Sequence, residues 1–188
     1  LVVCRLKVRV TGAEKLPEGR FLFVCNHRSK FDPIISWYIF RKNHLAFISK
    51  PENFNVPVFG RFIRKCCFMT IDRSDARSSL GTFTKAAELM KNDVVSVGVY
   101  PEGTRNRDGS LLPFHDGVFI IARKADVPVV VATIDGTEKI THNYPWKRTH
   151  IRLDIVGVID RDFVNTHRTA AVGVAVREMM ENNLKGTE

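Results

Sequence analysis

The chain has 188 residues, of which 44% are hydrophobic and 26% are charged, and its formal net charge is +9. This length and hydrophobic content are those of one globular domain with a substantial core. No stretch approaches the roughly 18 uninterrupted apolar residues that a membrane-spanning helix requires. We therefore expect a single domain over residues 1–188, whose basic surface favours phosphate-bearing partners.

Strand-like and helix-like segments alternate along the chain. Short runs rich in β-branched and aromatic residues predict strands over residues 2–10, 21–25, 45–49, 66–71, 94–100, 128–134 and 150–158. Apolar side chains at helical spacing predict helices over residues 33–41, 76–91, 117–125 and 169–183. This alternation predicts the α/β class, in the form of a single-domain αβ sandwich around a largely parallel central sheet.

A histidine and an aspartate follow the second predicted strand. His27 comes just after the apolar run 21–25, and Asp32-Pro33 is typical of a helix start with the aspartate as N-cap. Five helical steps of about 100° would leave the two side chains on different faces. His27 is therefore expected in the turn, where Asp32 can hold one ring nitrogen and leave the other free to accept a proton. A helix cap beside an inert loop histidine would have the same sequence.

A second polar motif follows the predicted strand 94–100. Gly103 permits a tight turn that exposes backbone N–H groups, and Arg105 offers a planar fork suited to phosphate. Thr104 adds a hydroxyl donor. Glu102 fits an anion site only if it binds a substrate hydroxyl or orients a basic neighbour. The alternative is a polar hairpin loop that carries a surface ion pair.

These motifs resemble the 1-acylglycerol-3-phosphate acyltransferases and the wider glycerolipid acyltransferase family. The resemblance rests on four blocks in the family's order, which together are far more specific than any one of them. The blocks run over residues 26–32, 58–73, 100–117 and 127–131. This chain departs from the usual pattern at His115, where the family has a lysine, and at Val131, where it has a second proline.

The resemblance implies an acyltransferase of phospholipid biosynthesis. A fatty acyl group would pass from an acyl thioester to the free hydroxyl of a lysophosphatidic acid-like acceptor, which gives phosphatidic acid. His27 would be the catalytic base and Asp32 the residue that orients it. The implied substrate-binding residues are Arg73, Glu102, Gly103, Thr104, Arg105 and Pro128, the last on the acyl-donor side.

No metal is expected, because the four cysteines, Cys4, Cys25, Cys66 and Cys67, lack metal-ligand spacing. No permanently bound cofactor is expected either. Coenzyme A or acyl carrier protein would carry the acyl thioester as co-substrate. The other expected partners are a lysophospholipid and an anionic membrane surface. Nucleic acid is not expected, since the sequence has no recognised nucleic-acid-binding motif. Three alternatives remain: transfer to another lysophospholipid, hydrolysis of the thioester through Cys25 or water, and lipid or nucleic-acid binding without catalysis.

Contact with a membrane is expected to use apolar and basic residues near the motifs. The predicted helix 33–41 has almost no polar face, so it is either buried or lies against lipid. The candidate contacts are Trp37, Phe40, Phe59, Phe62, Arg61, Arg64 and Lys65. We expect a cytoplasmic protein, peripheral to the inner face of a membrane. The resemblance also allows for an N-terminal anchor that is not present in this chain.

Overall fold

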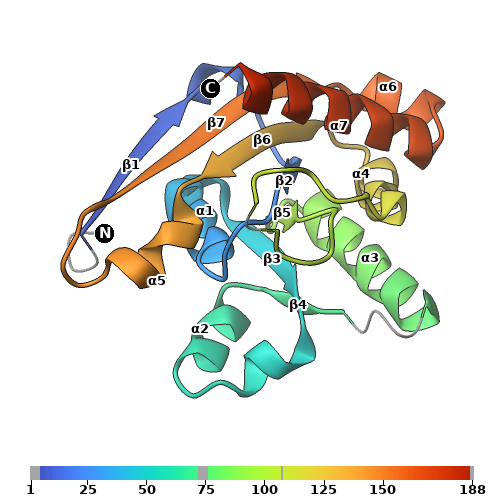
Figure 1. Cartoon of the computed structure of the whole chain (residues 1–188). Helices are drawn as coiled ribbons and strands as arrows, with labels where there is room; N and C mark the ends of the chain where they lie inside the picture. The colour runs from blue at the N-terminus through green and yellow to red at the C-terminus, as the bar shows by residue number, and fades with distance from the viewer. Residues whose placement is uncertain (1–4, 72–75, 107, 187–188) are drawn as a thin grey trace.

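One twisted sheet of seven strands forms the centre of the molecule (Figure 1). The computed structural model describes residues 5–71, 76–106 and 108–186. The strand order is β1-β7-β6-β2-β5-β3-β4. The strands are β1 (Leu6–Thr11), β2 (Leu22–Cys25), β3 (Leu45–Ser49), β4 (Met69–Thr70), β5 (Ser96–Val99), β6 (Val129–Asp135) and β7 (Thr149–Ile159).

All neighbouring strand pairs in the described part of the chain are parallel except β6 and β7. The helices are α1 (Asp32–Ile39), α2 (Phe59–Lys65), α3 (Ala76–Lys91), α4 (Ile120–Ala125), α5 (Ile140–Asn143), α6 (Arg161–Thr166) and α7 (Thr169–Lys185). Short 3-10 turns include η3 (Pro51–Asn55), η4 (Asp116–Phe119) and η5 (Thr137–Lys139). The α/β class and the largely parallel sheet are therefore confirmed.

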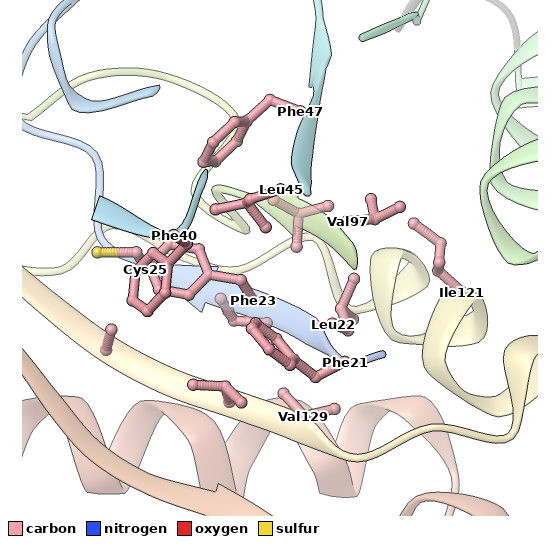
Figure 2. Close-up of a cluster of buried hydrophobic side chains, with 14 of the residues drawn as sticks. Phe21, Leu22, Phe23, Cys25, Phe40, Leu45, Phe47, Val97, Ile121 and Val129 are labelled. Atoms are coloured by element: carbon pink, nitrogen blue, oxygen red, sulfur yellow. The ribbon is translucent and has the colours of Figure 1, made fainter. Parts of the chain in front are cut away.

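Strand β2 is the centre of the core, and all four of its residues are buried. Because side chains alternate across a strand, Leu22 and Phe23 point to opposite faces of the sheet. Phe23 packs on Phe40 at the end of α1, with 4.9 Å between ring centroids. Leu22 lies on the side of α4, where Ile121 is also buried (Figure 2). Helices thus cover both faces, as a sandwich requires.

The parallel arrangement brings the two polar motifs to one edge of the sheet. β2 pairs with β5 on one side and with β6 on the other. Val24 lies opposite Val99, so the chain leaves β2 and β5 at the same level. The carboxyl edge of a parallel sheet is where ligands usually bind in open α/β folds.

Three local predictions differ from the structure. The predicted strand 66–71 survives only as β4, because Cys66 caps the end of α2 and Cys67 has a left-handed φ of +57°. Helix α2 itself was not predicted, because it is too short to show periodicity. That helix packs closely on η3: a Cβ at Gly60 would lie 2.1 Å from the carbonyl oxygen of Phe54. Helices α5 and α6 were not predicted for the same reason of length. The N-cap of α1 is Phe31, and Asp32 is its first residue, because the aspartate carboxylate turns back to the preceding loop.

The apolar helix 33–41 takes the buried alternative. Ile35 and Phe40 are each 2% exposed. Trp37 packs edge-on against Phe62, with 4.8 Å between centroids. Phe40 is therefore not a membrane contact, since its ring is part of the core.

Candidate active site

Four neighbours hold the loop histidine at the carboxyl end of β2. The backbone N–H of His27 donates to Oε1 of Glu102 at 2.8 Å, and its carbonyl accepts the N–H of Asn106 at 2.8 Å. Its Nδ1 lies 2.8 Å from Oδ2 of Asp32. The imidazole also stacks on the ring of Tyr100, with 4.3 Å between centroids. Backbone and ring are therefore both fixed before any ligand binds.

Asp32 is fully buried and saturated with hydrogen bonds. Its Oδ2 accepts the backbone N–H groups of Arg28 and Ser29, each at 2.7 Å, besides His27. Its Oδ1 accepts the hydroxyl of Thr137 in η5. Because an ionised carboxylate can only accept, Nδ1 of the histidine carries the hydrogen and Nε2 keeps its lone pair. The predicted hydrogen bond between the two residues is thus present, with the geometry of a general base and its orienting group.

Glu102 connects two loops around the histidine. Its side chain is 4% exposed, and its second oxygen accepts the N–H of Leu112 at 2.9 Å. Burial raises the pKa of this carboxyl group, while the N–H groups of Leu112 and His27 act in the opposite direction. Glu102 does not line the cavity described below. The structure places it behind the histidine, and its contact with substrate stays a prediction.

The rest of the second motif forms a tight turn. Gly103 has φ of +69°, a left-handed conformation that suits glycine, and its N–H donates to the carbonyl of Tyr100 at 3.0 Å. Thr104 and Arg105 follow it, both exposed and both lining the cavity. Among the described residues, no side chain or carbonyl bonds to the Arg105 guanidinium or to the backbone N–H of either residue.

A cavity of about 1070 Å³ adjoins these groups. Besides His27 and Arg105, its polar lining includes Lys30, Lys50 and His115, all exposed. The rest of the wall is mainly apolar and includes Phe47, Ile48, Val56, Phe59, Phe68, Ile71, Leu80, Phe83, Val99, Val118 and Ile120. The site therefore joins a cationic, proton-accepting end to a long apolar surface.

Of the predicted substrate-binding residues, Pro128 is not at this site, and Arg73 is not among the residues that the structure describes. Pro128 precedes β6 at its amino end, where its carbonyl accepts the N–H of Leu22. Leu22 and His27 are five residue steps apart along an extended chain, at about 3.3 Å a step, so Pro128 lies roughly 16 Å from the histidine, at the opposite edge of the sheet. It does not line the cavity. Arg73 lies outside the described residues.

Cys25 lacks the properties of a nucleophile. Its thiol is fully buried, and burial, followed by the nearby charges of Asp32 and Glu102, raises its pKa well above the ordinary value. It does not line the cavity. A reactive cysteine needs an accessible thiolate, so the structure argues against a covalent route through this residue. Within the described part of the chain, no group of histidine, cysteine and acidic side chains could hold a metal ion.

Sequence reasoning missed several residues of the site. Thr137 bonds to an aspartate 105 positions away, and nothing in the local sequence marks that contact. Lys30 and Lys50 look like ordinary surface lysines. His115 stood out only as a departure from the family pattern, and the structure places it in the cavity wall.

Comparison with known proteins identifies relatives of this chain. A family model described as Acyltransferase matches residues 7–135. The chloroplastic 1-acyl-sn-glycerol-3-phosphate acyltransferase BAT2 of Brassica napus is 38% identical over 136 residues, which is 71% of this chain and 39% of that protein. The 1-acyl-sn-glycerol-3-phosphate acyltransferase of Haemophilus influenzae is 24% identical over 166 residues, or 88% of this chain and 69% of that protein.

The fold has a solved relative as well. The crystal structure of the 1-acyl-sn-glycerophosphate (LPA) acyltransferase PlsC from Thermotoga maritima has a TM-score of 0.75 and 28% identity, over 95% of this chain and 71% of that one. The chain spans less than half the length of the Brassica napus relative and of a similar one from Arabidopsis thaliana. The family model nevertheless covers more than half of this chain and includes both polar motifs. The chain belongs to the Acyltransferase family.

Proposed function

We propose that this chain transfers a fatty acyl group from an acyl thioester to the free hydroxyl of a lysophosphatidic acid-like acceptor, giving phosphatidic acid. One observation carries the proposal: the hydrogen-bonded pair of His27 and Asp32 lies beside a cavity with a cationic end and an apolar wall. The names of the Brassica napus, Haemophilus influenzae and Thermotoga maritima relatives, all acyltransferases of this acceptor class, support the same acceptor.

The reaction needs one base and no covalent intermediate. His27 removes the proton of the acceptor hydroxyl through Nε2 as the oxygen attacks the thioester carbon. Asp32 stabilises the imidazolium that forms. The new C–O bond replaces the C–S bond, and the imidazolium then returns its proton to the departing thiolate. The products are therefore a neutral ester and a neutral thiol, and the imidazole returns to the state in which it began.

The turn after β5 supplies groups for the developing negative charge. The N–H groups of Thr104 and Arg105 have no partner among the described residues, and both residues line the cavity. Backbone donors aimed at an oxyanion in a site shielded from water are a common source of transition-state stabilisation. We assign this role to one or both of these N–H groups.

Cationic side chains around the same turn would hold the acceptor's phosphate. Arg105 is unpaired within the described residues, and its planar fork suits a phosphate group. Lys30, Lys50 and His115 add positive or protonatable groups on the same cavity. The family resemblance assigns phosphate binding to Arg73 as well, and we propose that role for it on the resemblance alone.

The apolar wall would take the acyl chains. Ligand cavities of drug-sized molecules are usually about 300–1000 Å³, so a volume of about 1070 Å³ suits a large, mostly apolar ligand. The donor would be a thioester of coenzyme A or of acyl carrier protein. An anionic membrane surface would present the acceptor, with the protein peripheral to the inner face of that membrane. The helices of the described residues include none with the length and apolar character needed to cross a bilayer.

A thiol-release assay across a panel of lysophospholipid acceptors tests this proposal. His27→Ala should abolish acceptor-dependent release while the circular dichroism spectrum stays unchanged, because the imidazole contributes little to the core. Cys25→Ala is the matched control and should keep most of the activity. Near-normal turnover in His27→Ala would refute the mechanism. Equal thiol release with and without acceptor would instead identify a thioester hydrolase.

A further inference from the structure

The loop before β7 exposes aromatic and basic side chains together. Trp146 is 82% exposed and Tyr144 is 49% exposed, and Lys147 and Arg148 beside them are exposed too. We refer to residues 144–148 as the aromatic loop. No acidic residue occurs between positions 139 and 153. Tryptophan and tyrosine flanked by lysine and arginine are typical of surfaces that lie at the water–lipid boundary.

The aromatic loop projects from the same edge of the sheet as His27. β6 runs parallel to β2, and the chain turns back into β7 through η5, α5 and the aromatic loop. The start of this connection contacts the active site, since Thr137 donates to Asp32 and Glu138 pairs with Arg28. The connection is therefore fixed to the site where it begins, and the aromatic loop near its other end is exposed.

A second exposed segment leaves the same edge after β3. Val56 and Val58 are 45% and 80% exposed, and Arg61, Arg64 and Lys65 are exposed next to them. We refer to residues 56–65 as the α2 segment. No acidic residue occurs between positions 53 and 71. Figure 1 shows α2 and α5 on the same lower side of the molecule.

The backbone of the α2 segment holds an apolar side chain outward. Val58 has φ of +64°, and the N–H of Phe59 donates to the carbonyl of Pro57 at 2.7 Å, which closes a three-residue turn. This conformation is strained for a β-branched residue. Val56 and Phe59, on either side of the turn, both line the substrate cavity. The segment is thus continuous with the wall of the site.

We propose that the aromatic loop and the α2 segment dock together on an anionic lipid bilayer, one on each side of the active site. This inference rests on the proposed function and extends it. In the sheet, three strand spacings separate β6 from β3, which puts the bases of the two segments about 14 Å apart with β2 and β5 between them. Paired apolar and cationic groups at both points match a surface of acyl chains and negative headgroups.

This surface differs from the one expected from sequence. The basic residues Arg61, Arg64 and Lys65 remain in it, whereas Phe40 is buried and Trp37 and Phe62 pack on each other. The aromatic loop was not predicted, because a tryptophan in a short polar stretch gives no sign of its exposure.

Vesicle binding by the whole chain tests the proposal without requiring turnover. The chain contains two tryptophans, so Trp37→Phe leaves Trp146 as the single reporter. Its fluorescence should shift to the blue, and acrylamide should quench it less, when phosphatidylcholine vesicles containing phosphatidylglycerol are added. Pure phosphatidylcholine vesicles should have a smaller effect. High salt should weaken binding, because it screens the basic residues.

A charge-reversal pair and a matched control locate the contact. Lys147→Glu with Arg148→Glu should weaken binding to the anionic vesicles by about 30-fold or more. This is the effect expected when two basic residues lose their attraction to negative headgroups. Lys91→Glu with Arg161→Glu makes the same change in net charge at the opposite edge of the sheet, where both residues are exposed. This control should bind much more tightly than the loop variant. Both should keep wild-type turnover on detergent-dispersed acceptor.

Three results would overturn the inference. The first is an unchanged Trp146 emission while the protein sediments with vesicles, and the second is an equal loss of binding in the loop and control variants. The third is a failure to bind anionic vesicles at low salt, with or without tight binding of an oligonucleotide instead. Absence of turnover on dispersed acceptor, with vesicle binding intact, would refute the proposed function and not the docking surface.

Discussion

Removing the Glu102 carboxylate should weaken both the fold and catalysis. Glu102→Ala leaves the N–H groups of His27 and Leu112 without their acceptor. A fully buried unpaired donor costs about 1–3 kcal/mol, and these two are only partly buried, so the free energy of unfolding should fall by about 2 kcal/mol, the lower bound for two donors. For a domain of this size the lower bound corresponds to a fall in Tm of at least about 4 °C.

Catalysis should suffer through the position of the histidine. The backbone of His27 would lose one of its two hydrogen bonds to the loop that follows β5. A displacement of about 1 Å can reduce the rate up to about 100-fold. We therefore expect a lower kcat with KM values near those of the wild type. Glu102→Gln keeps one oxygen acceptor and similar volume, so it should fall between the wild type and Glu102→Ala in both stability and kcat.

Thermal unfolding and steady-state kinetics of the wild type, Glu102→Ala and Glu102→Gln test this positioning role. The sequence motif by itself suggested another role for Glu102, namely contact with a substrate hydroxyl. If Glu102→Ala unfolds at the wild-type temperature and raises the KM of the acceptor alone, the positioning role is refuted. Substrate contact would then be the better explanation.

Further predictions concern Asp32, the phosphate and pH. Thr137→Val removes the hydroxyl that donates to the buried Asp32, so kcat should fall with little change in KM, and Thr137→Ser should restore it. Arg105→Ala should raise the KM of the phosphorylated acceptor by about 10–100-fold, the equivalent of one charge-assisted hydrogen bond, while Tm stays nearly constant because the side chain is exposed; an equal rise in the donor's KM would contradict this role. Burial raises the pKa of Glu102 in the folded state, so ionisation of this carboxyl group destabilises the fold. As pH rises from about 4.5 through the raised pKa, the unfolding free energy of the wild type should therefore fall relative to that of Glu102→Gln. Chemical denaturation of both proteins over this pH range measures the difference. A pH-independent difference would contradict the assignment of that pKa.

The amino-acid sequence by itself was sufficient for the local parts of the site. The spacing of His27 and Asp32, with a buried strand before them and Pro33 after them, predicts a turn and a helix start that bring carboxylate and imidazole together, and the structure has that contact. Gly103 likewise has the left-handed conformation that its place after Pro101 and Glu102 suggests. Each of these features depends on residues close together in the sequence, 21–33 for the first and 101–103 for the second. Long helices and buried strands were also predictable, because their apolar periodicity repeats several times.

Only the tertiary structure decided which distant segments meet. Thr137 reaches Asp32 because β6 lies beside β2, and Pro128 lies far from the histidine because it enters β6 at the other end. The burial of Glu102 and the exposure of Trp146 likewise depend on neighbours from other parts of the chain. The physical reason is that local periodicity determines what a segment becomes, whereas the order of strands in a parallel sheet depends on the packing of the whole chain. Burial, charge environment and the direction of each loop follow from that order.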